Sequence, residues 1–257
     1  MVNTVQAVEP LKVVIPHWAI NGDQQNTYLY KLLILAFEKT TPLYGPVDLQ
    51  VYPENLSGAR LMADLKNNVT VDIVWSGTTE QREKDFFAIR MSLLKELNEY
   101  RVLLIRREDQ QKFSGIKTID DLRKFTAGSG ADWPSTAVLR NNDLPVVAVN
   151  NGALLFSMLK AKRFDYMSRN MFEVWDEEKL YEKEGLVVEK TLLLHGGVPF
   201  YYFVNKKNTK LAERIERGLK MAVDDGSFAK LFFTFLDFKR GHEEIIFGSR
   251  NVLELKK

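Results

Sequence analysis

The chain has 257 residues, of which 45% are hydrophobic and 27% charged, a composition typical of a globular protein of one or two domains. Its net charge of +2 and its interspersed basic and acidic residues argue against a nucleic-acid-binding surface, which needs a basic stripe. The absence of cysteine excludes disulfides, thiolate nucleophiles and cysteine-ligated zinc.

The N-terminal half of the chain predicts strands and helices in alternation. Strands are expected at residues 13–15, at residues 47–53 and from residue 71 onward, where apolar residues run together or alternate. A turn is expected at Asn21-Gly22-Asp23. The first helix is predicted to be capped by Asn26 or Thr27, and the second by Ser57. This β-α-β-α-β order predicts a mostly parallel sheet covered by helices.

The stretch from residue 86 to residue 107 is ambiguous. Its first part is rich in Leu, Lys and Glu, which favours a helix, whereas residues 100–107 alternate as a strand does. A second strand at residues 198–206 follows much later in the chain. Because these two strands bracket another α/β run, they predict an inserted domain that is entered through one strand and left through the other.

The bracketed run repeats the β-α-β-α-β order over residues 125–168. Thr118 and Asp121 have the spacing of a capping box in a preceding helix. Pro134 stands at the expected first position of another helix. Beyond the run, residues 209–235 predict amphipathic helices that are broken at Asp225-Gly226-Ser227.

Four stretches of this sequence resemble the type II periplasmic substrate-binding proteins, in particular those that bind polar amino acids. VDIVWSGTTEQREKDF at residues 71–86 resembles the family's strand, turn and Thr-x-x-Arg segment. TIDDLRKFTAGSG at residues 118–130 resembles its entry into the second domain, and FSMLKAKRFDYM at residues 156–167 a later helix and strand. The helices at residues 209–235 resemble its C-terminal region.

The resemblance implies an α/β fold with two Rossmann-like lobes, two crossing hinge strands and a ligand cleft between the lobes. The predicted boundaries are 1–105 and 199–257 for the first lobe and 106–198 for the inserted lobe. It also implies a monomeric periplasmic protein without a cofactor, whose partner is an ABC permease or a membrane sensor. The first residues, MVNTVQAVEPLK, lack the features of a signal peptide, so a periplasmic location requires a signal that has been removed. No apolar run reaches the roughly 18 residues of a membrane span.

In the first lobe, the candidate ligand-binding residues follow the ends of strands, where α/β sheets bind ligands. The resemblance implies that Arg82 pairs with a ligand carboxylate, and an ion pair with Glu83 or Asp85 is its alternative. Glycine in the turn lets a ligand approach the backbone closely. Either a core position or a place at the wall of the cleft suits the tryptophans. The candidates of this lobe are Trp18, Trp75, Ser76, Gly77, Thr78 and Arg82.

In the second lobe, the candidates follow two further predicted strands. Ser129, Gly130, Asp132 and Trp133 precede a helix, and Asp132 is either a ligand contact or the N-cap of that helix. Arg169 and Asn170 follow the next strand, where the family places an Asp for the ligand ammonium.

An Arg at that position favours a second anionic group on the ligand instead, or an ion pair with Glu173 four residues on. The sequence thus predicts a binding protein for an amino acid or organic anion. A dehydratase that uses Glu173 or Asp132 as a general acid is the enzymatic alternative, and a cytoplasmic effector-binding domain is a third.

Overall fold

The computed structural model describes residues 9–20 and 23–256, and the chain divides into two compact units. Unit 1 comprises Met1–Leu93 and Phe200–Phe235, and unit 2 comprises Leu94–Pro199 and Leu236–Lys257. Residues 94–105, Pro199 and residues 236–257 thus belong to unit 2, whereas the sequence assigned them to the first lobe. Their strand pairing explains the difference, because β5 (Tyr100–Arg106) and β12 (Asn251–Glu254) both join the sheet of unit 2.

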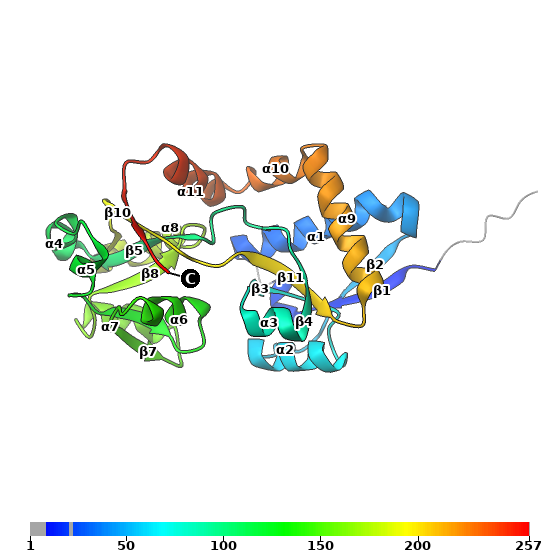
Figure 1. Cartoon of the computed structure of the whole chain (residues 1–257), viewed down its shortest axis with the longest axis horizontal. Helices are drawn as coiled ribbons and strands as arrows, with labels where there is room; N and C mark the ends of the chain where they lie inside the picture. Colours follow the sequence, from blue (N-terminus) through cyan, green and yellow to red (C-terminus); the bar gives the residue numbers. More distant parts are fainter. Residues whose placement is uncertain (1–8, 21–22, 257) are drawn as a thin grey trace, which may run out of the picture. The chain divides into compact units, whose positions relative to one another are not determined.

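In its described residues, unit 1 contains five strands and the helices packed with them; Figure 1 labels these elements. β1 and β2 pair in parallel, whereas β11 runs antiparallel between β3 and β4. The strands are β1 Leu11–Ile15, β2 Val47–Val51, β3 Ile73–Gly77, β4 Phe86–Ile89 and β11 Phe200–Asn205. The helices are η1 His17–Ile20, α1 Gln24–Tyr44, α2 Gly58–Asn67, α3 Glu80–Asp85, α9 Thr209–Asp224 and α10 Ser227–Phe232.

The predictions for unit 1 are wrong at three places. The first is the mostly parallel sheet, because among the described strands β3 and β4 pair antiparallel with β11, and β1 and β2 alone are parallel. Ser57 caps α2 as predicted, but the N-cap of α1 is Asp23, whose carboxylate accepts from the backbone N–H of Asn26. The helix favoured over the start of residues 86–107 is also wrong, because β4 pairs with β11 there and turns follow to residue 99. Asn21 and Gly22, the first two residues of the predicted turn, lie outside the described residues, as do the first eight residues of the chain.

Unit 2 is organised around one mixed sheet in the order β12-β10-β5-β8-β6-β7, with β9 paired to β5. Figure 1 shows β12, in red, beside β10, with which it pairs in parallel. Besides β5 and β12, the strands are β6 Ala127–Gly130, β7 Val146–Val149, β8 Tyr166–Asn170, β9 Leu186–Val188 and β10 Leu192–His195. The helices are η2 Arg107–Asp109, α4 Gln110–Ser114, α5 Ile119–Leu122, α6 Pro134–Asn141, α7 Leu154–Lys160, α8 Val174–Tyr181, η3 Glu182–Glu184 and α11 Leu236–Phe247.

Local signals position the elements of unit 2 as predicted. Thr118 and Asp121 form the capping box of α5, and Pro134 is the first residue of α6. β6 runs parallel to β7 and to β8, so the carboxyl ends of β6 and β8 lie at the same edge of the sheet. β5 runs antiparallel to β8, which brings the start of β5 to that edge as well.

Candidate functional site

The tryptophans of unit 1 pack against each other near the ends of β1 and β3. The rings of Trp18 and Trp75 meet edge to face with their centroids 4.8 Å apart, and Tyr202 lies on Trp75 at 5.8 Å. Trp75 is only 3% exposed, and its indole N–H donates to Oδ1 of Asn26 over 2.8 Å. Trp75 is therefore a core side chain with almost no surface left for a ligand. Trp18 is half-buried and keeps part of its surface open to solvent.

The turn from β3 into α3 uses its hydroxyl groups to hold the chain. Thr79 is the N-cap of α3, and its Oγ1 accepts from the backbone N–H of Arg82 over 3.1 Å. Oγ1 of Thr78 donates to Oε1 of Glu83 over 2.8 Å. Ser76 and Gly77 are the last residues of β3 and pair with β11. The predicted residues of this turn thus lie next to one another, and the side chain of Thr78 is hydrogen-bonded to Glu83 in α3.

Arg82 is a cation without a counter-ion in the part of the chain that the structure describes. Its Nη1 donates to the carbonyl oxygen of Gly77 over 2.5 Å. The two acids that the sequence offered as partners are paired elsewhere: Glu83 with Arg90 and Asp85 with Lys66, both at 2.8 Å. The alternative of an ion pair for Arg82 is therefore wrong. Partial burial lowers the pKa of its guanidinium, since desolvation disfavours the charged form.

In unit 2, β6 ends beneath a tryptophan. An added Cβ at Gly130 would meet the ring of Trp133 at 2.5 Å, so only glycine lets this ring lie so close to the strand. Ser129 is buried, with its hydroxyl 2.7 Å from Oγ1 of Thr136. Asp132 is exposed and is not the N-cap of α6, because Trp133 occupies that position without a side-chain cap bond. The capping role suggested for Asp132 is therefore wrong.

Arg169 lies in β8, and two carboxylates neutralise its positive charge. Its Nε donates to Oε2 of Glu177 over 2.7 Å, its Nη2 bonds the other oxygen of Glu177, and Oε1 of Glu173 lies 3.2 Å from Nη2. Its guanidinium carbon lies 4.9 Å from the ring centre of Trp133. Although desolvation acts to lower the pKa of Arg169, both carboxylates raise it. The predicted pair with Glu173 is present, and Glu177, which the sequence analysis missed, is the closer partner.

Arg101, at the start of β5, is a second residue that the sequence analysis missed. Its Nε donates to Oγ of Ser168 over 2.9 Å, its Nη2 to the carbonyl oxygen of Ser168 over 2.8 Å, and its Nη1 to Oδ1 of Asn170. Asn170 in turn donates its Nδ2 to Oε1 of Glu173 over 2.8 Å. Desolvation lowers the pKa of Arg101 to about 10, so it remains protonated at neutral pH. Arg101, Arg169, Asn170, Glu173 and Glu177 together form what we call the β8-end cluster.

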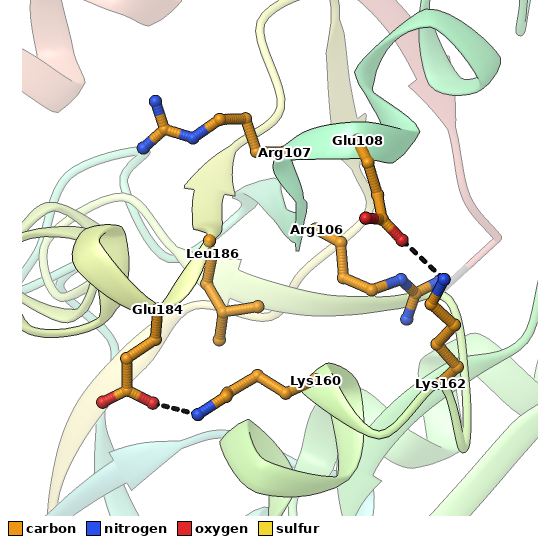
Figure 2. A pocket seen from close by; sticks show the side chains of 8 residues that line it. Arg106, Arg107, Glu108, Lys160, Lys162, Glu184 and Leu186 are labelled. Carbon is orange, nitrogen blue, oxygen red and sulfur yellow. Dashed lines mark hydrogen bonds and ion pairs between the residues drawn. The ribbon is translucent and has the colours of Figure 1, made fainter.

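A cavity of about 510 Å³ lies at the opposite end of β5 (Figure 2). Figure 2 shows two ion pairs in its wall, Lys160 with Glu184 and Lys162 with Glu108. Arg106 is held by Asp109 and by the carbonyl oxygens of Leu159 and Phe164. The two lysines and Arg106 in the wall of this cavity are thus already paired with acidic side chains. None of the predicted site residues lines the cavity.

Within residues 9–20 and 23–256, no helix is both long and apolar enough to span a membrane. The same residues contain no group of three or more His, Asp or Glu side chains that could hold a metal ion.

The fold is similar to that of solved amino-acid-binding proteins. An ancestral arginine-binding protein bound to arginine superposes with a TM-score of 0.64 and 17% identity, over 90% of this chain and all of that one. A probable amino-acid ABC transporter extracellular-binding protein from Bacillus subtilis gives 0.62 and 19%, over 89% of this chain and 99% of its own. A Salmonella typhimurium periplasmic binding protein of high arginine specificity gives 0.62 and 14%, over 88% and 99%.

At these identities the likeness is one of fold. It confirms the predicted α/β fold of the type II periplasmic substrate-binding proteins. Another similar structure is an ancestral amino acid-binding protein described as a precursor of cyclohexadienyl dehydratase, with a TM-score of 0.62 and 14% identity over 87% of this chain and 94% of that one. No protein-family model and no curated protein matches the sequence.

Proposed function

We propose that the protein is a periplasmic solute-binding protein that takes up a small polar or anionic solute. Its fold is shared with amino-acid-binding proteins along most of their length, and this likeness supports a binding role. By the same analogy, the protein delivers its solute to an ABC permease or presents it to a membrane sensor.

Arg82 is the observation that carries the proposal. It lies just beyond the end of β3, at the edge of an α/β unit where ligands characteristically bind. The two nearby acids are committed to Arg90 and Lys66, so its guanidinium is available to a ligand. A planar fork of N–H donors matches a carboxylate in both shape and charge. In this proposal Arg82 binds the carboxylate of the solute, next to Ser76 and Gly77, while Trp18 supplies apolar contact.

A thermal-shift screen over amino acids, dicarboxylates and aromatic acids tests the proposal. A solute at 100 times its dissociation constant adds about 2.7 kcal/mol to the free energy of unfolding, which raises Tm by roughly 5–10 °C. Arg82→Ala is expected to weaken binding by about 10- to 100-fold, the range for a lost charge-assisted hydrogen bond. The matched control is Arg140→Ala, which removes an exposed arginine in the last turn of α6.

The proposal fails if no solute in the screen raises Tm, or if Arg82→Ala binds the identified solute as tightly as the wild type does. A similar structure that relates to the enzymatic alternative is that of an amino acid-binding protein described as a precursor of a dehydratase, and the likeness is one of fold. Glu173, one of the two acids predicted for the enzymatic alternative beside Asp132, is already bonded to Arg169 and Asn170, which argues against that role for Glu173. If mass spectrometry detects the conversion of a bound solute into a product, the result would favour the enzymatic alternative.

A further inference from the structure

Asn151 and Gly152 lie in an exposed turn directly after β7. β7 runs parallel to β6 and ends at Val149, opposite Gly130, so the turn lies at the sheet edge that carries the predicted site residues of unit 2. Asn151 is exposed and belongs to no helix or strand. An added Cβ at Gly152 would lie 3.0 Å from the ring of Trp133, so the turn also borders that candidate residue.

An asparagine that precedes a glycine is open to attack by its own backbone. The nucleophile is the backbone nitrogen of the next residue, and glycine has no Cβ to hinder the approach. Oδ1 of Asn151 accepts from the backbone N–H of Ala153 over 3.1 Å. The ring that this hydrogen bond closes contains the backbone nitrogen of Gly152, so the side chain folds back toward that nitrogen. The same bond draws electron density from Cγ and stabilises negative charge on Oδ1, both of which favour the attack.

Neither reacting group of the turn is held by another hydrogen bond within residues 9–20 and 23–256. The backbone N–H of Gly152 donates to no described acceptor, and Nδ2 of Asn151, the leaving group, has no described partner. The hydrogen bonds that lead into α7 use the carbonyl oxygens of the two residues instead, which accept from Leu154 and Leu155. The nitrogen of Gly152 can therefore lose its proton and reach Cγ without breaking a hydrogen bond of the fold.

Asp225-Gly226 is the other acid or amide followed by glycine in the described part of the chain, and its hydrogen bonds oppose the same reaction. The backbone N–H of Gly226 donates to the carbonyl oxygen of Val223 over 3.1 Å. The carboxylate of Asp225 is bonded to Lys39 and accepts from the backbone N–H of Ser227 over 3.0 Å. These bonds lower the pKa of Asp225, and an ionised carboxylate is a poor electrophile. The fold thus leaves one of the two pairs open and closes the other.

We propose that Asn151 is a site of spontaneous deamidation. The deprotonated backbone nitrogen of Gly152 attacks Cγ of Asn151, the Cγ–Nδ2 bond breaks, and ammonia leaves behind a succinimide ring. Water then opens this ring to aspartate or isoaspartate, so the reaction needs no oxidant, reductant or cofactor. Either product replaces a neutral amide with a carboxylate, which adds negative charge to the sheet edge beside Trp133. The reaction does not require solute binding, so it stands or falls separately from the proposed function.

Incubation of the whole protein at mildly alkaline pH tests this inference. Trypsin, used at mildly acidic pH to halt the reaction, releases residues 141–160 as one peptide, in which mass spectrometry locates the exchange of an amide for a carboxyl group. In the folded protein we expect Asn151 to deamidate at a rate within about tenfold of that in the urea-unfolded protein. Isomerisation of Asp225 to isoaspartate should be slower in the folded protein than in the unfolded one by more than about tenfold.

Asn151→Gln should remove the modification from this peptide, because its longer side chain closes the corresponding ring much more slowly. The matched control is Asn150→Gln, which should leave it unchanged, since Asn150 is also exposed but is followed by a residue with a Cβ. Deamidation at Asn150 instead of Asn151 would overturn the inference. It would also be overturned if Asn151 stayed intact in the folded protein while it reacted in the unfolded one. Equal rates for Asp225 in both states would refute the control that we assign to the hydrogen bonds.

Discussion

Gly218 sets how closely α9 approaches α1, which makes Gly218→Ala a sharp test of the packing of unit 1. An added Cβ would lie 2.0 Å from the carbonyl oxygen of Ala36 and 2.6 Å from its carbonyl carbon. Both atoms are backbone, so no side-chain rotation relieves the overlap. Alanine is favoured over glycine in a helix by about 1 kcal/mol. Overpacking of a tight interface costs about 1–3 kcal/mol or more. A backbone overlap of this size belongs at the upper end, so after the gain of about 1 kcal/mol we expect a net loss of about 2 kcal/mol or more.

Gly58→Ala is the matched control, since Gly58 opens α2 and an added Cβ there meets nothing within 4 Å. It should be neutral or stabilise the protein by up to about 1 kcal/mol. Urea unfolding followed by circular dichroism measures both variants, and unchanged m-values would show that the two free energies are comparable. Equal stability of Gly218→Ala and the wild type would refute the close helix contact.

Two further predictions concern charged side chains of unit 2. Glu177→Gln removes the bidentate partner of buried Arg169 but leaves Glu173 beside it, so urea unfolding should show a loss of about 1–3 kcal/mol. An unchanged midpoint would mean that the pair does not contribute to stability. Hydrogen bonds from Lys124 and Thr118 lower the pKa of Asp121 to about 2 from its ordinary 3.8. Because the folded pKa is the lower one, this stabilisation is present above about pH 4 and is lost toward pH 2. The Tm difference between wild type and Asp121→Asn should therefore narrow between pH 5 and pH 2, and a constant difference would contradict the assignment.

Local signals in the sequence predicted most of the fold correctly. The caps at Ser57 and Thr118 depend on residues three positions away, and the strands depend on short apolar patterns. The cap of α1 was misassigned because Asn26, a good N-cap residue, accepts a hydrogen bond from Trp75 instead. No residue near Asn26 in the sequence indicates that its hydrogen-bond partner lies 49 residues away.

The stretch after β4 shows the same limit for apolar periodicity. Leu93, Leu94 and Leu97 have the spacing of one helical face, and all three are fully buried. The chain nevertheless forms turns there, and the backbone N–H of Leu93 donates to the carbonyl oxygen of Phe200. The Leu, Lys and Glu content of this stretch thus favoured the wrong conformation, because a contact with β11 decides the conformation.

The charge of the candidate site depends on the same kind of distant contact. Arg82 and Arg169 look alike in the sequence, since each has an acid within four residues that can neutralise it. Glu83 pairs with Arg90, seven residues on, and Asp85 with Lys66, 19 residues back, which leaves Arg82 without a counter-ion. Arg169 instead gains Glu177, eight residues on. Arg101 joins the same cluster without a signal in the sequence, because its place beside Asn170 follows from strand register alone.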